Sequence, residues 1–183
     1  MVVQRPLEMT DEQILEALLR EDASAQRLLY DKFARKMFGV CLRYTKQREE
    51  AEDLLQEGFI KVFQKISSYK AEGSLEGWIR RVMVNTALDY LRQQKMHWTD
   101  LEDVVEAGSE PVIGHEIGAG ELMAELQKLP VGYKTVFNLH AIEGYSHKEI
   151  GSNLGISEGN ARVKLNRAKE KLKEIIKKQG YGF

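Results

Sequence analysis

Cysteine is almost absent from this chain of 183 residues, in which Cys41 is the single example. One thiol cannot form an intrachain disulfide, and its place on an apolar helical stripe favours a buried thiol over a reactive one. No apolar run approaches the roughly 20 residues that a membrane-spanning helix needs. Residues 1–11 lack the basic-then-apolar pattern of a secretion signal. We therefore expect a cytoplasmic protein without membrane insertion.

The patterns of metal and cofactor sites are missing as well. No glycine-rich phosphate-binding loop occurs in the sequence. The four histidines show no metal-ligand spacing among themselves or with Cys41. These histidines are His97, His115, His140 and His147. The sequence therefore predicts no metal, no cofactor and no catalytic activity, so that the protein would not be an enzyme.

Alternation of apolar and polar residues with a period of two, the pattern of a strand, is not found either. Apolar residues recur instead at spacings of three and four, which is the helical period. This pattern predicts an all-α protein. The predicted helices are Thr10–Leu19, Asp22–Thr45, Arg48–Ile66, Ser74–Tyr90, Glu121–Leu129, Val131–Ile142, Ser146–Leu154 and Ser157–Lys178.

The formal net charge of −1 conceals an uneven distribution of charge along the chain. Residues 99–118 contain six acidic and no basic residues, whereas residues 119–183 contain eleven basic and seven acidic ones. The acidic segment also contains Pro111 and several glycines, and it has no apolar period, which is typical of a linker. We predict two small helical domains, at residues 10–98 and 119–178, joined by a flexible acidic linker at residues 99–118.

The second domain ends in the pattern of a helix-turn-helix. Ser146 and Glu149 match a capping box, Gly155 suits the left-handed end of that helix, and Ser157 can cap the next. A short turn with a glycine sets two helices at a steep angle, so that the second can enter the major groove of DNA. We expect Val163 of the second helix to pack back onto the first, together with Leu165.

The second helix of this motif is strongly basic, with eight basic and three acidic residues between Ser157 and Lys178. Arginine and asparagine can each bond a base edge through two parallel hydrogen bonds. An ordinary solvated helix with lysines near its C-terminus is the alternative. Against that alternative, the first basic residues lie early in the helix, where the helix dipole opposes positive charge. The candidates for DNA contact are Ser157, Asn160, Arg162, Lys164 and Arg167.

Acidic residues crowd the helix predicted at Arg48–Ile66. Asp53, Gln56, Glu57 and Ile60 fall at helical spacings and form one outward stripe, called the acidic stripe below. Like charges so close together repel one another unless a basic partner receives them. Enrichment of acids at a helix start can explain the acids of the first turn. The middle turns have no such explanation, so the acidic stripe favours a protein-docking face.

Three segments resemble the sigma factors of bacterial RNA polymerase, in the order in which that family has them. EAEDLLQEGF at residues 50–59 is similar to a helix of sigma region 2. GWIRRVMVNTALDYLR at residues 77–92 is similar to the segment that follows it, and residues 145–172 resemble region 4. The linker is too short to hold the further domain of larger sigma factors. The resemblance is therefore to the extracytoplasmic-function (ECF) subfamily of the sigma-70 family.

This resemblance implies a promoter-specific transcription initiation factor that binds core RNA polymerase, recognises the −35 and −10 elements and assists promoter melting. The implied partners are core RNA polymerase, through its β′ clamp helices and β flap, promoter DNA, and an anti-sigma factor. The acidic stripe would contact the clamp helices, and the basic helix would read the −35 element. The acidic linker would suit passage through the polymerase's RNA channel, and a soluble spacer is the alternative.

The resemblance also assigns residues to the −10 element. Asn85 matches the position that lines the pocket of a flipped base, and the loop at residues 67–74 matches one that varies with the −10 sequence. The alternative for Tyr69 is a ring that covers its own loop, and the alternative for the arginines is a solvated face. Trp78 is assigned to the core. The residues assigned to the −10 element are Tyr69, Lys70, Arg80, Arg81, Asn85 and Arg92.

One departure from the family concerns the helix-turn-helix, in which Gly151 stands where alanine is common. A glycine inside a helix should loosen it by up to about 1 kcal/mol. A conventional helix-turn-helix regulator with a sensing or dimerising N-terminal domain is the rival reading. That reading explains residues 119–178 equally well, but it leaves the acidic stripe and residues 78–92 unexplained.

Overall fold

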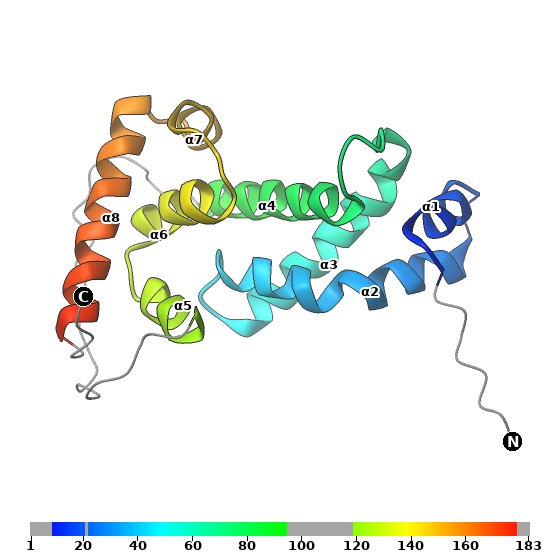
Figure 1. The fold of residues 1–183 in the computed structure, drawn as a ribbon, viewed down its shortest axis with the longest axis horizontal. Helices are drawn as coiled ribbons and strands as arrows, with labels where there is room; N and C mark the ends of the chain where they lie inside the picture. The colour runs from blue at the N-terminus through cyan, green and yellow to red at the C-terminus, as the bar shows by residue number, and fades with distance from the viewer. Residues whose placement is uncertain (1–8, 21, 95–118, 179–183) are drawn as a thin grey trace, which may run out of the picture. The chain divides into compact units, whose positions relative to one another are not determined.

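The computed structural model describes residues 9–20, 22–94 and 119–178, and the linker predicted at residues 99–118 lies outside these ranges. The described residues form helices and turns without a strand, so the all-α prediction is confirmed. The chain divides into two compact units on either side of Tyr90, each of which is described by itself. Figure 1 shows the helices in chain order, from α1 to α8.

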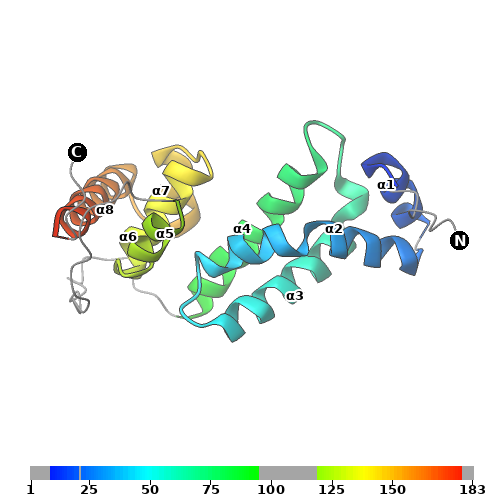
Figure 2. The same ribbon diagram turned by 60° about the horizontal axis from the view of Figure 1, so that its bottom comes forward.

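The described part of the first unit consists of one short 3-10 turn and four α-helices, the last of which extends beyond Tyr90 to Gln93. The helices are α1 (Asp11–Leu19), α2 (Ala23–Leu42), α3 (Arg48–Lys65) and α4 (Leu75–Gln93), and the turn η1 (Ile66–Ser68) follows α3. Helices α2 and α3 lie side by side (Figure 2). All four helices correspond to predicted ones, and their bounds differ from the predicted bounds by a few residues.

Local side-chain caps explain where these helices begin. Thr10 and Gln13 form a capping box, in which the Thr10 hydroxyl accepts the Gln13 N–H at 3.3 Å and the side-chain Oε1 of Gln13 accepts the Thr10 N–H at 3.0 Å. The Asp22 carboxylate accepts the Ser24 N–H at 2.8 Å, and Ser74 accepts the Gly77 N–H at 3.1 Å. Each bond satisfies a backbone donor that a helix start otherwise leaves unpaired.

One apolar stripe from each of the three long helices fills the core of the first unit. Cys41 lies in this core, and burial raises the pKa of its thiol to about 12, so the thiol is protonated at neutral pH. The prediction of a buried, unreactive cysteine is therefore confirmed. The core residues include Leu29, Phe33 and Met37 of α2, Leu54 and Val62 of α3, and Ile79, Met83 and Leu88 of α4.

Helices α3 and α4 approach each other closely at Gly58. A Cβ atom at this position would lie 2.1 Å from Sδ of Met83, a fully buried side chain of α4. A side chain at this position would therefore require the flexible Met83 thioether to shift. The absence of a side chain at Gly58 leaves room for Met83.

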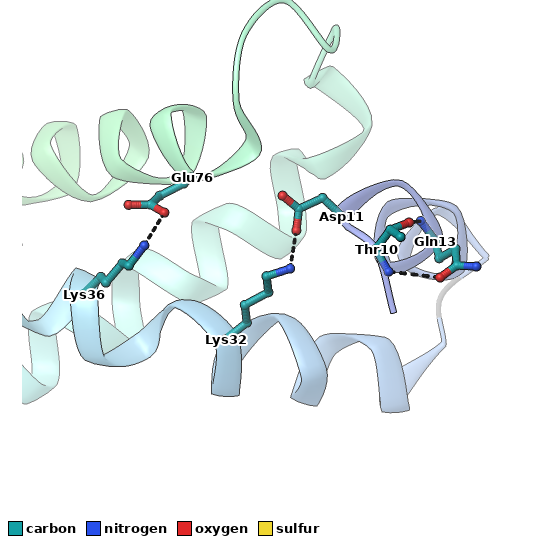
Figure 3. A network of polar contacts seen from close by, with 6 residues as sticks. All are labelled: Thr10, Asp11, Gln13, Lys32, Lys36 and Glu76. Carbon is teal, nitrogen blue, oxygen red and sulfur yellow. Dashed lines mark hydrogen bonds and ion pairs between the residues drawn. The ribbon is translucent and has the colours of Figure 1, made fainter. Parts of the chain in front are cut away.

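Two ion pairs join the helices of the first unit at the surface (Figure 3). Lys32 Nζ of α2 lies 2.7 Å from Asp11 Oδ1 of α1, and Lys36 Nζ lies 2.6 Å from Glu76 Oε2 of α4. All four side chains are well exposed, so each pair contributes at most about 1 kcal/mol to stability. Stability comes mainly from the buried stripes, and the ion pairs add a preference for this helix arrangement.

The described part of the second unit contains α5 (Ala119–Gln127), α6 (Val131–Phe137), the π turn η2 (Asn138–Ile142), α7 (His147–Leu154) and α8 (Glu158–Lys178). The helix predicted at Val131–Ile142 is thus present, but its last five residues take the wider π geometry. Helix α8 packs against α5, α6 and α7. Leu126, Leu129 and Ala168 form one buried cluster of this unit.

The helix-turn-helix forms as its capping residues predict. The Ser146 hydroxyl accepts the Glu149 N–H at 3.2 Å, and the Glu149 carboxylate accepts the Ser146 N–H at 2.8 Å. Gly155 ends α7 in the left-handed conformation with φ of 68°. The Ser157 hydroxyl accepts the Asn160 N–H at 3.1 Å and caps α8. These caps fix where α7 stops and α8 starts, and therefore the length of the turn.

Gly151 of α7 lies against the backbone of the turn that follows the helix, where there is no room for a side chain. A Cβ atom there would lie 2.7 Å from the backbone oxygen of Ile156 and 3.3 Å from the backbone nitrogen of Glu158. The Ile156 N–H also donates to the Gly151 carbonyl at 3.0 Å, which keeps the two segments together. The expectation that Gly151 only loosens its helix is therefore incomplete, because the glycine permits a close contact with the turn.

We expect Gly151→Ala to lower the free energy of unfolding of the second unit by about 1–2 kcal/mol. Overpacking against backbone costs about 1–3 kcal/mol, which exceeds the gain of up to about 1 kcal/mol in helix propensity. Hydrogen exchange of the α7 and α8 amides measures the change. Ser152→Ala, at the exposed neighbouring position, is the matched control and should leave exchange nearly unchanged. Equal or slower exchange in Gly151→Ala contradicts the close contact.

Candidate functional site

The acidic stripe lies on the outward side of α3. Asp53, Gln56, Glu57 and Ile60 are all exposed, and Ile60 is 55% exposed although it is apolar. The opposite side of α3 is buried in the core. The folded unit therefore presents three polar side chains and one apolar side chain together, on a side of α3 that the core does not use.

Glu57 is less free than its neighbours on the acidic stripe. Lys61 Nζ lies 2.8 Å from Glu57 Oε1 and 3.4 Å from Asp89 Oδ2 of α4. Burial lowers the pKa of Lys61, but the two carboxylates outweigh burial and raise it, so the ammonium stays charged. Within the described ranges, Asp53 has no ion pair. A substitution at Asp53 can therefore test docking without disturbing the contact between α3 and α4.

A groove of about 380 Å³ between α2 and α3 adjoins the acidic stripe. Arg48 lies across it, with its guanidinium 4.9 Å from the Phe38 ring centre and 2.8 Å from Glu52 Oε1. Sequence reasoning missed this groove. Its signal was an aromatic residue directly after a core position at two places in α2, Tyr30 after Leu29 and Phe38 after Met37. The lining residues are Tyr30, Ala34, Arg35, Phe38, Arg48, Glu52, Leu55 and Gln56.

Helix α4 presents a second candidate surface. Trp78, Arg81, Asn85 and Arg92 are spaced by three, four and seven residues and therefore share one side of the helix. Arg81, Asn85 and Arg92 are exposed. The Tyr69 ring lies 5.7 Å from the Trp78 ring, which places the loop before α4 at the end of this surface.

The −10 set is not placed on one surface as a whole. Arg80 is half-buried and shares the packing side of α4 with Met83 and Val84, about half a turn from Asn85. Lys70 is exposed in the loop. The Tyr69 hydroxyl donates to the Gly73 carbonyl at 2.7 Å, so the ring does cover its own loop.

The assignment of Trp78 to the core is wrong. Its indole is half-buried and lies against Tyr69 at the surface of the first unit. The core position of this turn belongs to the next residue, Ile79, which is fully buried.

Helix α8 buries one side and exposes the other. Ala161, Leu165, Ala168 and Leu172 form the buried stripe. Ser157 is exposed at the cap, and Asn160 is half-buried at the rim. The exposed side of the first three turns carries Arg162, Val163, Asn166 and Arg167.

Lys164 and Val163 have exchanged the roles expected of them. Lys164 is only 8% exposed, and its ammonium lies 5.6 Å from the ring centre of Tyr133 in α6. Val163 is 48% exposed and does not pack back onto α7, so that expectation is wrong. The cause is the helical spacing, because Lys164 follows Ala161 by three residues and so lies on the buried side of α8.

Two histidines lie close together beside α8. The rings of His140 and His147 are 4.6 Å apart, and His140 Nδ1 donates to the Tyr145 carbonyl at 2.9 Å. Nε2 of His147 is buried and has no hydrogen-bond partner among the described residues. Burial, followed by the positive charges of His140 and Arg162, lowers the pKa of His147 from its ordinary value, and Glu158 opposes this.

Among the described residues, no three or more His, Cys, Asp or Glu side chains gather in a way that could hold a metal ion. No helix within these residues is long and apolar enough to cross a membrane.

Comparison with known protein families decides between a sigma factor and a conventional regulator. Residues 29–96 match the model of Sigma-70 region 2, and residues 119–172 match the model of Sigma-70 region 4. The chain belongs to the sigma-70 family, and its similarity to several ECF sigma factors places it in the ECF group. The first unit therefore contains region 2 and the second contains region 4, and the family makes the chain a promoter-specific transcription initiation factor.

Individual relatives agree with this assignment. The chain is 32% identical to the RNA polymerase sigma factor CarQ of Myxococcus xanthus over 158 residues, which cover 83% of this chain and 91% of CarQ. It is also 32% identical to the ECF RNA polymerase sigma factor SigE of Mycolicibacterium smegmatis over 152 residues, which cover 79% of this chain but only 59% of that relative.

A solved structure supports the same fold. The sigma factor RpoE of Bartonella quintana, crystallised with the anti-sigma factor NepR, gives a TM-score of 0.52 at 18% identity. The alignment covers 82% of this chain and 96% of RpoE.

We expect region 4 to become less stable as the pH falls from about 7.5 to 5.5. Because folding lowers the pKa of His147 below its ordinary 6.5, the unfolded chain binds more protons, and stability present above this pH is lost below it. Hydrogen exchange of α8, corrected for intrinsic rates, measures this loss, and His147→Gln should remove most of it. Region 2 is an internal control, because residues 9–20 and 22–94 contain no histidine. An unchanged pH dependence in His147→Gln contradicts the assignment to this ring.

Proposed function

We propose that this sigma factor binds core RNA polymerase through region 2, reads the −10 element with region 2 and the −35 element with region 4, and assists promoter melting. One observation carries the proposal. The side chains assigned to polymerase by resemblance lie on the one side of α3 that the core does not use, and an exposed isoleucine lies among them. We propose no catalytic role and no cofactor for the chain.

The polymerase face consists of the acidic stripe and the adjoining groove. Asp53 and Gln56 offer hydrogen-bond acceptors to a basic partner, and Ile60 offers apolar area. Interfaces combine an apolar centre with a polar rim in this way. The β′ clamp helices of polymerase are the proposed occupant. Glu57 contributes charge to this face while it holds Lys61.

The −10 surface consists of the side of α4 that bears Arg81, Asn85 and Arg92, together with Tyr69 and Lys70 of the loop. Melting exposes bases, and an aromatic ring that stacks on one contributes roughly 1–3 kcal/mol. The half-buried Trp78 extends the aromatic part of this surface beyond Tyr69. Arg80 is left out, because it lies on the packing side of α4.

The −35 surface is the exposed side of α8 in its first three turns. Arg162 and Arg167 are exposed there and have the donors that guanine accepts in the major groove. Glu158 lies 3.3 Å from Arg162 and can orient it. Ser157 and Asn160 lie at the start of the same helix, whereas the buried Lys164 is left out of the set.

The remaining parts of the proposal concern organisation and regulation. We retain domain bounds of residues 10–98 and 119–178 with an acidic linker at residues 99–118, and contact of region 4 with the β flap. Because a solved relative is bound to an anti-sigma factor, we propose such an inhibitor here too. Binding to polymerase and to promoter DNA requires the protein to be in the cytoplasm, and we propose that location.

We expect Asp53→Arg to weaken binding to core RNA polymerase by tenfold or more. The substitution puts a positive charge where a basic surface is proposed to dock, and like charges brought together at an interface cost several kcal/mol. Competition with a labelled sigma factor for purified core enzyme measures the affinity. The charge-matched control is Glu16→Arg on α1, which is exposed and lies outside the proposed face.

The fold should survive both substitutions, because Asp53 and Glu16 are exposed and unpaired among the described residues. Circular dichroism and thermal melting verify this. Equal affinity for core enzyme in Asp53→Arg, Glu16→Arg and the unmodified chain contradicts the docking face.

A further inference from the structure

Val163 is a large apolar side chain of region 4 that is strongly exposed. It is 48% exposed in the second turn of α8, whereas the apolar residues of the buried stripe are at most a few per cent exposed. A β-branched residue also has a lower helix propensity than alanine or lysine. Neither packing nor helix formation explains a valine at this position.

The surroundings of Val163 leave it open to an approaching ligand. Gly159, one turn earlier on the same side, has no side chain, and a Cβ atom there would meet only Ser157 Oγ at 3.9 Å. Asn166 and Arg167 follow one turn later and are exposed. Val163 is thus an exposed apolar side chain among polar and basic ones. The helix surface one turn before it, at Gly159, is open.

We infer that Val163 is a specificity-determining residue, which contacts the 5-methyl group of a thymine in the −35 element. The inference rests on the proposed function of α8 and deepens it. The thymine methyl is the apolar feature that base pairs present in the major groove, where alanine, threonine and phenylalanine side chains contact it. A single valine flanked by arginines fits this methyl, whereas a protein partner needs an apolar area of several hundred Å².

The helix geometry places this thymine near the bases that the arginines read. Four residues of helix rise by about 6 Å, which separates Val163 from Arg167 along the axis. One base pair occupies about 3.4 Å of the duplex axis. The thymine therefore lies within about two base pairs of the position that Arg167 reads.

The test uses the full chain assembled with core RNA polymerase. A promoter library with a randomised upstream element and a fixed −10 element yields the preferred −35 sequence. Each thymine of that sequence is then replaced singly by deoxyuridine, which removes the methyl and leaves every hydrogen-bonding group in place. Binding of the holoenzyme to each duplex is measured for the unmodified protein, Val163→Ala and Arg162→Ala.

We expect deoxyuridine at one position to weaken binding of the unmodified holoenzyme about fourfold, the factor that corresponds to about 0.8 kcal/mol for one buried methyl group. Val163→Ala should bind the thymine and deoxyuridine duplexes within about twofold of each other. Arg162→Ala should keep the fourfold difference, because it removes a different contact. Two further duplexes carry cytosine or 5-methylcytosine at that position. The unmodified holoenzyme should bind the 5-methylcytosine duplex more tightly than the cytosine duplex, because only the former has the methyl group.

Three results overturn the inference: a preferred −35 sequence without thymine, a deoxyuridine series without effect in the unmodified protein, or an undiminished deoxyuridine effect in Val163→Ala. The second measurement needs no variant and so does not depend on how Val163→Ala folds. Failure of the proposed function is distinct, because the holoenzyme would then select no upstream sequence at all.

Discussion

Burial of one apolar stripe along each long helix is the constraint on which the surfaces of this sigma factor depend. In α8, burial of Ala161, Leu165 and Ala168 fixes the rotation of the helix about its axis. That rotation turns Arg162 and Val163 outward and Lys164 inward. The rotation of α8, and not charge alone, therefore decides which of its basic residues are exposed and could contact DNA. The same holds for α3, where the core claims one side and leaves the acidic stripe on the other.

Two glycines leave room for close contacts in the two units. Gly58 lets α3 approach Met83 of α4, and Gly151 lets α7 approach the turn before α8. Both glycines are buried, and so is the Met83 side chain that Gly58 meets. Because the proposed contacts and the packing use opposite sides of the same helices, exposed side chains can change while the fold persists, whereas a side chain at Gly151 would meet backbone atoms of the turn.

Much of the fold could be predicted from sequence because its signals are local. Capping pairs such as Ser146 with Glu149 act within one turn, so the ends of the helices followed from residue type and spacing. The outward position of Asp53 and the burial of Cys41 followed from helical periodicity. The family followed from three motifs in order, since a helix-turn-helix alone does not distinguish a sigma factor from a regulator.

The predictions that were wrong concern features that depend on tertiary packing. Trp78 is large and apolar, yet the stripe of α4 that meets the other helices passes through Ile79. A lysine has a long apolar stem that can be buried along a helix face, as at Lys164, and its charge gave the opposite expectation. The groove between α2 and α3 requires two helices to be placed together, and no single stretch of sequence contains that information.

The most direct test is transcription by purified core RNA polymerase from a library of promoters randomised in both elements. Our account predicts transcripts that require this chain, start at defined positions, and come from templates that share one upstream and one −10 sequence. Core enzyme alone should give none of these transcripts. Transcription that does not respond to the chain, or that responds without preference for either element, contradicts the account.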